Sequence, residues 1–201
     1  VRRVARRTRW VREVEWVAAG QLAPGDELVL NDHRALSGWQ GAGTDAEGYL
    51  LGLLIGDGTL KHDKAVLSVW APAWKTDANG ERSCAPTSVA GIVAAAEAAA
   101  ATLEHRADFH GFQRPIAGRG EMRLASTPLA RLARDWGMAP GHKTLTAEIE
   151  RGGSDFTRGL LRGLFDADGS VQGTQDKGVS VRLSQVDIDA LRATQRMLGR
   201  L

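Results

Sequence analysis

Two aspartates in this sequence stand in the same local pattern, each near the end of an apolar run and followed by glycine. Asp57 lies in the segment LLGLLIGDG (50–58), and Asp168 lies in LRGLFDADG (161–169). A glycine directly after an apolar run is a common helix end, because glycine readily takes the left-handed conformation that closes the last turn. The pattern therefore predicts two buried helices, each with an aspartate at its C-terminal end.

Small residues recur four positions apart in both segments, which places them on one face of each helix. A helix face without large side chains lets another backbone come close, so we expect the two helices to pack on each other. The packing residues would be Gly52, Gly56, Gly163 and Ala167. This pairing would bring Asp57 and Asp168 together at the same end.

Two neighbouring carboxylates at the partly negative ends of helices repel each other. A hard divalent cation such as Mg²⁺ would relieve the repulsion, since it takes oxygen ligands from one or two carboxylates and keeps several waters. Such a site is suited to metal-assisted hydrolysis of a phosphodiester. A single apolar helix ending in Asp-Gly is usually only a capped core helix. Here both copies are followed by a short strand, a polar turn and a second strand, which indicates an internal repeat.

The two segments resemble the signature of the LAGLIDADG homing endonucleases, in the double-motif form often carried inside inteins. The second copy matches at nearly every position, whereas the first has Ile55 where the signature has an acid. The resemblance covers about residues 45–201. It implies an α/β (α+β) fold, with αββαββα repeats around a pseudo-two-fold pair of motif helices and a saddle of strands on double-stranded DNA.

The same resemblance implies double-strand cleavage of DNA with a divalent metal, Mg²⁺ or a similar cation. By motif position, the metal-binding carboxylates are Asp57 and Asp168, and the backbone carbonyls of Gly56 and Ala167 are possible further ligands. Lys143 matches a lysine that family members direct toward the scissile phosphate, where it would stabilise charge or polarise water. The family's usual proline a few residues later is absent. The alternative interpretation of Lys143 is a solvent-exposed loop lysine.

Side chains alternate along a strand, so each hairpin should turn its polar positions away from the helices. We expect Leu67 and Val69 to face the helices in the first hairpin, and Val179, Val181 and Leu183 to do so in the second. The opposite faces could then contact DNA, where Arg and Gln can read base edges in the major groove. The DNA-binding candidates are Lys61, Lys64, Ser68, Trp70, Gln172, Thr174, Ser180, Arg182 and Ser184.

The chain is expected to divide into four parts. Residues 1–36 resemble a remnant of the all-β splicing domain of an intein (a Hint domain), and 37–44 are a glycine-rich linker. Residues 45–140 form the first repeat, and 141–201 form a connector and a truncated second repeat. The chain lacks the nucleophilic Cys or Ser at its start and the His-Asn pair at its end that splicing needs. We therefore interpret it as an internal intein fragment that cannot splice.

Local signals give further expectations. Thr44 or Asp45 should cap the first motif helix, and the Pro24-Gly25-Asp26 sequence should form a tight turn that feeds a strand. Further helices are expected at 88–103, 127–136 (capped by Thr127) and 187–198, and strands at 109–112 and 121–125.

The amino-acid composition says less than the motifs about binding partners and cellular location. The formal net charge is +2 and the isoelectric point is near 9.0, so a DNA-binding surface would need its positive charge concentrated on one face. Six arginines among residues 1–15 are either a DNA-phosphate arm or a solvated strand face. The lone Cys84 fits a reducing compartment, and no run reaches membrane-spanning length. We expect a cytoplasmic protein without a membrane partner, and a monomer that forms an intramolecular pseudo-dimer.

Three functions stay open at this point: a sequence-specific endonuclease, a non-catalytic LAGLIDADG DNA-binding module, and an inactive intein fragment without a DNA role. Metal-dependent cleavage separates the first from the others, and DNA binding in EDTA separates the second from the third. The stretch 58–70 also resembles inteins of ribonucleotide reductase, which makes that enzyme a candidate host protein.

Overall fold

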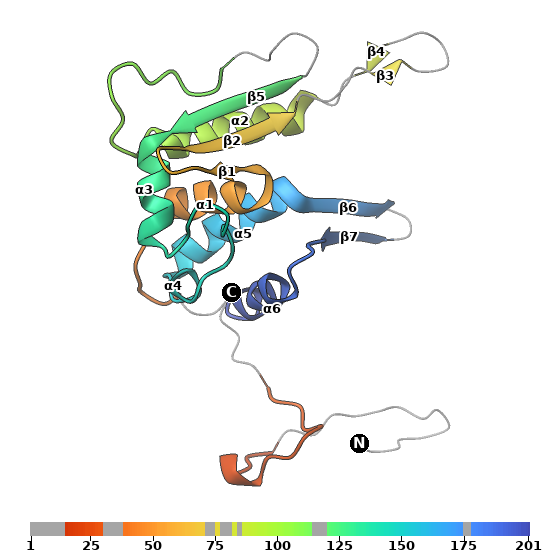
Figure 1. Ribbon diagram of the computed structural model, residues 1–201. Coiled ribbons are helices and arrows are strands. Elements are labelled where there is room, and N and C mark those ends of the chain that lie inside the picture. Colours follow the sequence, from red (N-terminus) through yellow and green to blue (C-terminus); the bar gives the residue numbers. More distant parts are fainter. Residues whose placement is uncertain are drawn as a thin grey trace.

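The computed structural model describes residues 15–29, 38–70, 75–76, 82–83, 86–113, 120–174 and 178–201. Its helices are α1 (Asp45–Asp57), α2 (Pro86–Ala100), α3 (Thr127–Asp135), α4 (Ala147–Glu150), α5 (Ser154–Asp168) and α6 (Ile188–Leu198), with a short 3₁₀ turn at Ala19–Gln21. Its strands are β1 (Thr59–Leu60), β2 (Ala65–Trp70), β3 (Lys75–Thr76), β4 (Arg82–Ser83), β5 (Glu121–Ser126), β6 (Gly169–Thr174) and β7 (Gly178–Leu183). The result is an α+β fold with small antiparallel sheets (Figure 1).

The helices α1 and α5 pack on each other along their length at the centre of the structure (Figure 1). Their glycines allow this approach. A Cβ atom built on Gly52 would overlap the carbonyl oxygen of Leu160, and one built on Gly163 would overlap that of Tyr49. Contacts follow the same order along both helices, so α1 and α5 run in the same direction and their C-terminal ends meet.

Both helices end at a glycine, but not in the left-handed conformation that the sequence predicted. Gly58 has φ −93° and ψ 174°, and Gly169 has φ −79° and ψ 154°, which is extended backbone. The prediction was wrong about the reason for glycine. A Cβ atom on Gly58 would lie 2.7 Å from the Cα atom of Leu54, and one on Gly169 would overlap the carbonyl oxygen of Phe165. The chain leaves each helix so close to its last turn that no side chain fits.

The start of α1 agrees with its expected cap. The Thr44 side chain accepts a hydrogen bond from the backbone N–H of Glu47, and the Glu47 carboxylate accepts one from the backbone N–H of Thr44. This reciprocal capping box satisfies two N–H groups that would otherwise lack partners. The helix then buries residues from Gly48 to Ile55, so α1 is the core of the fold.

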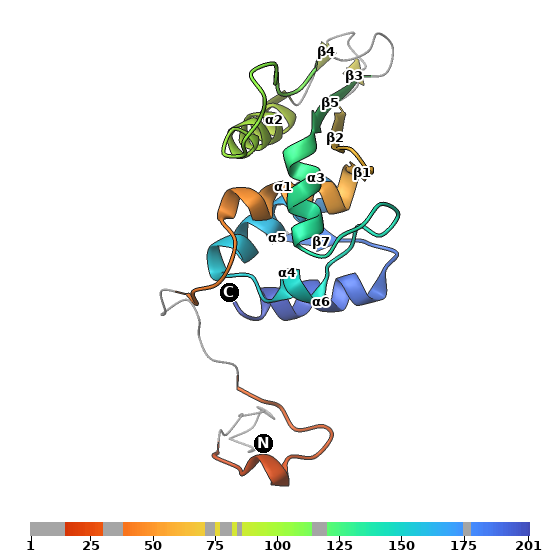
Figure 2. The same ribbon diagram turned by 60° about the vertical axis from the view of Figure 1, so that its left-hand side comes forward.

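After α1, the strands β1, β2 and β5 form an antiparallel sheet in that order. β2 and β5 pair over six residues, from Ala65 opposite Ser126 to Trp70 opposite Glu121. Leu67 and Val69 turn inward, with only 1% and 9% of their surface exposed. Helix α2 lies against one face of this sheet, and none of the described helices lies over the other face (Figure 2).

Two local expectations in this region were wrong. Residues 109–112 form no strand, and only Gln113 makes a β-bridge, to Arg123. The cap of α3 is Ser126 rather than Thr127, because β5 runs directly into the helix and the Ser126 hydroxyl accepts from the N–H of Leu129.

The second hairpin, β6–β7, departs most from its expected burial. Val171 lies opposite Val181 and Gly173 opposite Val179, so the apolar residues share one face as the alternation requires. However, Val171, Val179 and Val181 are 71%, 58% and 63% exposed, and only Leu183 is partly buried. The physical reason is that the hairpin extends beyond α5 (Figure 1), and no described helix or strand covers its apolar face.

At the N-terminal side, residues 15–29 are all exposed. The expected turn is present, since the N–H of Asp26 donates to the carbonyl of Ala23, but residues 27–29 form no strand. The arginines at positions 2–12 lie outside the described residues. No helix among the described residues is long and apolar enough to cross a membrane.

The described part of the expected linker, residues 38–44, is fixed to the start of α5. The backbone N–H of Trp39 donates to the Ser154 hydroxyl at 2.9 Å, its indole N–H donates to the Gly152 carbonyl at 2.9 Å, and the N–H of Gly153 donates to the carbonyl of Ala42. This segment therefore helps to hold α1 and α5 in register at their N-terminal ends.

Candidate active site at the ends of the paired helices

The parallel packing of α1 and α5 brings Asp57 and Asp168 to the same end of the helix pair. A Cβ atom built on Gly56, the residue before Asp57, would overlap the side chain of Ala167 and lie 3.2 Å from a carboxylate oxygen of Asp168, so the two helix ends approach closely here. The pKa of Asp57 is raised above its ordinary value, first by partial burial and then by the negative charge of Asp168. The charge of Asp168 therefore acts on Asp57 at this end of the helix pair.

Lys143 lies at the same end and binds the C-terminus of α1. Its ammonium donates to the carbonyl oxygens of Ile55 and Gly56, both at 2.7 Å, and to that of Leu54 at 3.2 Å. Burial lowers the pKa of Lys143, while the charges of Asp168 and Asp57 oppose this shift. The side chain is half-buried and ordered by three acceptors, so it is not a solvent-exposed loop lysine. A cation at this position also complements the negative end of the helix dipole.

Gln185 is a site residue that the sequence interpretation missed. It follows the end of β7, and its side-chain N–H group donates to a carboxylate oxygen of Asp168. No motif marks this glutamine in the sequence. Only the return of β7 toward the end of α5 brings it to the acid.

The residues present fit a hard divalent cation. Asp57 and Asp168 supply carboxylate oxygens, which Mg²⁺ prefers, and a site with two carboxylates leaves room for coordinated waters. Within the described residues, no group of three or more His, Cys, Asp or Glu side chains is placed to hold a metal. The carbonyl of Gly56, a predicted further ligand, already accepts from the ammonium of Lys143. Placing a metal cation on that same oxygen would bring two positive charges together.

The acid that only the second motif carries has a different role. Asp166 accepts a hydrogen bond from the hydroxyl of Tyr49 at 2.8 Å, and burial together with this bond raises the pKa of Tyr49. The guanidinium of Arg162 lies 4.4 Å from the centre of the Tyr49 ring and pairs with Asp45 at 2.9 Å. These contacts tie α5 to α1, so Asp166 holds the helix pair together and lies outside the acid pair.

Among the predicted DNA-binding residues, Ser68, Trp70, Gln172, Ser180 and Arg182 alternate with the apolar strand residues and lie on the opposite faces of the hairpins. In the second hairpin, Ser170 lies opposite Arg182 and Gln172 opposite Ser180, and Arg182 donates to the Ser180 hydroxyl at 3.3 Å. Ser184 is exposed just beyond β7, and Thr174 ends β6 with its side chain outside the described atoms.

In the first hairpin, Ser68 is half-buried and Trp70 is 50% exposed. Lys61 is exposed in the turn, where Lys64 lies 3.8 Å from Asp63. Ser68 and Trp70 alternate with the buried Leu67 and Val69, so they lie on the outer face of β2.

Arg123 is a second residue that the sequence interpretation missed. It lies opposite Ser68 in the β2–β5 pairing, on the same face of the sheet. Its Nε and one Nη donate to the two carboxylate oxygens of Glu121, each at 2.7 Å. Arginine side chains can recognise guanine through two parallel hydrogen bonds, so Arg123 is a further candidate for contacting DNA on this face. The sequence alone could not indicate Arg123, because its place on this face depends on the register between β2 and β5.

Comparison with protein families identifies a LAGLIDADG-like domain at residues 155–201. This range contains α5 with Asp168, the β6–β7 hairpin, Gln185 and α6. No curated protein matches the chain. Together with the α+β arrangement, the matched domain indicates a DNA-binding or nuclease module of the homing-endonuclease type.

Proposed function

We propose that this protein is a LAGLIDADG endonuclease that makes sequence-specific, Mg²⁺-dependent double-strand breaks in DNA. The observation that supports this most strongly is the meeting of Asp57 and Asp168 at the shared end of α1 and α5, where partial burial and then the charge of Asp168 raise the pKa of Asp57. A structural role does not require two carboxylates at this position. Two such carboxylates repel each other, and the pKa of Asp57 stays raised even with the positive charge of Lys143 beside it.

In this proposal Asp57 and Asp168 hold the cation, with the carbonyl of Ala167 as a possible further ligand. When bound, the cation supplies charge stabilisation and an activated water for phosphodiester hydrolysis. Gln185 fixes the orientation of Asp168 through its hydrogen bond. Lys143 keeps a positive charge beside the acid pair, and this charge opposes the rise in the pKa of Asp57. The Gly56 carbonyl serves Lys143 rather than the metal.

The DNA would lie across the polar faces of the hairpins. Lys61, Lys64 and Arg182 suit phosphate contacts, which give salt-dependent affinity, and Arg123 and Gln172 suit base edges. Trp70, Ser68, Ser180, Ser184 and Thr174 complete the proposed surface. We also propose an intein origin, a monomer with an internal pseudo-dimer of the two motif units, and a cytoplasmic location.

The experiment is cleavage of a randomised duplex library in Mg²⁺ by the wild-type protein and by its D57N and D168N variants. Cuts at a limited set of sites that disappear in both variants would support the proposal and yield the target sequence. Cleavage that persists in both variants would exclude these acids as the catalytic pair.

A non-catalytic DNA-binding module is the second candidate. It is favoured by the position of Lys143, whose ammonium is bound to three helix carbonyls instead of extending toward a phosphate. This candidate predicts duplex binding that is equal in EDTA and in Mg²⁺, with no cleavage in either. An inactive intein fragment without a DNA role would bind no duplex at all.

A further inference from the structure

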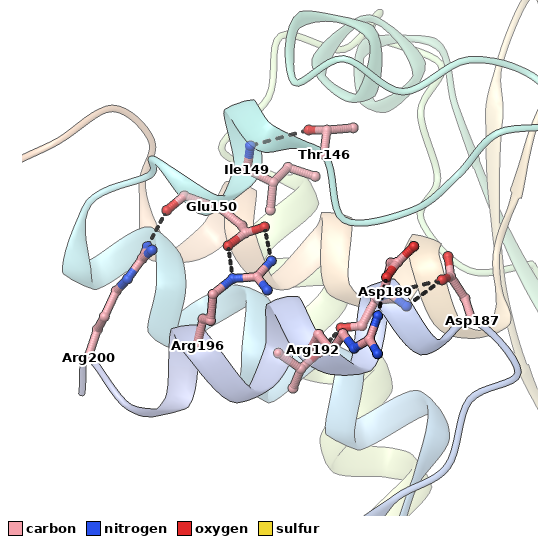
Figure 3. Close-up of polar contacts among 10 residues, drawn as sticks. Thr146, Ile149, Glu150, Asp187, Asp189, Arg192, Arg196 and Arg200 are labelled. Carbon is pink, nitrogen blue, oxygen red and sulfur yellow. Dashed lines mark hydrogen bonds and ion pairs between the residues drawn. The ribbon is translucent and has the colours of Figure 1, made fainter. Parts of the chain in front are cut away.

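Helix α6 is attached to the connector between α3 and α5 by contacts at both of its ends. Near the C-terminal end, Arg196 makes two hydrogen bonds to the carboxylate of Glu150, at 2.9 and 2.6 Å, and Arg200 donates to the Glu150 carbonyl (Figure 3). At the N-terminal end, the Thr144 hydroxyl donates to Asp187 at 3.0 Å. These contacts therefore join the connector and α6 at two separate points.

The Thr144–Asp187 contact, at the N-terminal end of α6, joins two segments that each carry a residue of the candidate active site. Thr144 directly follows Lys143, which binds the end of α1. Asp187 is two residues after Gln185, which binds Asp168 at the end of α5. One hydrogen bond thus joins the two segments that approach the acid pair from the connector and from the strand β7.

Hydrogen bonds on both of its oxygens fix the carboxylate of Asp187 in position. Its other carboxylate oxygen accepts from the backbone N–H groups of Asp189 and Ala190, at 2.9 and 3.2 Å, and so caps α6. Figure 3 shows this cap at the start of the helix. The cap orients the remaining oxygen toward Thr144, and both oxygens have defined partners.

We propose that Thr144 and Asp187 are a positioning pair, whose hydrogen bond sets Lys143 and Gln185 in place relative to Asp57 and Asp168. The catalytic consequence of this pair rests on the proposed endonuclease function, whereas its structural consequence does not. A small misplacement of groups around a reacting centre is costly, so we expect about a tenfold loss of cleavage rate when the bond is removed.

The test compares T144V, which keeps the shape of the side chain and removes the hydroxyl, with T144S, which keeps the hydroxyl. D187S provides a second route, because serine also caps a helix but its shorter side chain does not reach Thr144. R196Q is the matched control, since it breaks another contact between α6 and the connector. For each metal-free protein, NMR records the side-chain amide of Gln185 and the ammonium of Lys143. Single-turnover cleavage and DNA affinity are measured alongside.

We expect T144V and D187S to shift both resonances and to slow cleavage with unchanged DNA affinity, while T144S resembles the wild type. R196Q should lower the melting temperature and leave both resonances in place. The proposal is overturned if T144V and D187S leave the two resonances unchanged, or if R196Q shifts them as much. If the wild-type protein does not cleave DNA, the NMR comparison still tests the positioning pair. Failure of the endonuclease proposal can therefore be distinguished from failure of the positioning proposal.

Discussion

The ammonium of Lys143 donates to the carbonyl oxygen of Gly56 at 2.7 Å, directly beside the acid pair. The bond joins the connector to the last turn of α1 and places a positive charge where the helix dipole and two carboxylates are negative. Lys143 therefore stabilises the folded arrangement of the connector and the end of α1, and this role does not depend on any action on a phosphate. The two roles can be separated by experiment.

Replacing Lys143 with methionine should reduce both stability and cleavage. The three carbonyl acceptors lose a charged donor, which we expect to cost about 1–3 kcal/mol of unfolding free energy. The pKa of Asp57 should rise further, because Lys143 is the group that lowers it. Denaturant unfolding and carboxylate NMR measure these effects. In the control K61M, stability and the pKa of Asp57 should stay the same, and DNA affinity alone should fall.

The D57N variant should be more stable than the wild type. Because the folded protein raises the pKa of Asp57, the ionised carboxylate destabilises the fold at pH values above that pKa. Allowing for solvent screening, removing its charge should add about 0.5 kcal/mol, or roughly 1–2 °C in melting temperature.

The control for D57N is D135N, which removes an exposed acid from the C-terminal residue of α3. Calorimetry at neutral pH compares the two. Equal gains would mean that the helix dipole, rather than burial and the charge of Asp168, makes the ionised Asp57 destabilising.

Alanine at Gly52 should prevent the close packing of the helix pair. The new Cβ atom would overlap the carbonyl of Leu160 on the facing helix, and backbone cannot move aside cheaply. We expect a loss of at least about 3 kcal/mol, measured by urea unfolding. Gly91 in α2 has no atom within 4 Å of its would-be Cβ, so G91A should instead stabilise the protein by about 0.5–1 kcal/mol. A mild effect of G52A would contradict the packing described for α1 and α5.

The contact between Glu150 and Arg196 should make stability depend on pH. The hydrogen bonds from Arg196 lower the pKa of Glu150 below its ordinary value of 4.5. This stabilisation is complete above 4.5 and is lost as the pH falls through the lower, folded-state value. Since Arg196 is half exposed, the contribution should be about 0.5–1 kcal/mol. Unfolding of wild type and E150Q should differ at neutral pH and converge in acid; a constant difference would contradict this assignment.

Replacing Arg123 with glutamine should weaken DNA binding through the loss of a bidentate base contact. We expect a cost of about 1–3 kcal/mol on the selected target, and relaxed preference at one base pair. Arg131, exposed on α3, gives the control variant R131Q. Binding titrations on the target and on single-base variants measure both effects. A uniform loss across all base variants would assign Arg123 to a phosphate instead.

The sequence predicted the central relationship because it depends on local and repeated signals. Gly52 and Gly163 mark the packing faces, and Asp57 and Asp168 mark the ends of the helices. The Thr44–Glu47 cap was equally accessible, since it involves residues three apart.

The features that the sequence did not predict depend instead on contacts between residues far apart in the chain. Gln185 and Arg123 became visible only once the strands returned them to the acid and to the outer face of β2. Val179 and Val181 alternate as expected, but alternation cannot show whether another element covers the face they form. The extended conformation of Gly58 and Gly169 was missed because sequence reveals a glycine but not which neighbour requires it.

The most direct test of the account is cleavage of a plasmid that carries the selected target, with the wild-type protein and the D57N, D168N and D135N variants. In Mg²⁺ the wild type and D135N should produce linear DNA, and neither D57N nor D168N should do so. Linear product at the wild-type rate from D57N or D168N would contradict the claim that the two acids act together as one nuclease site.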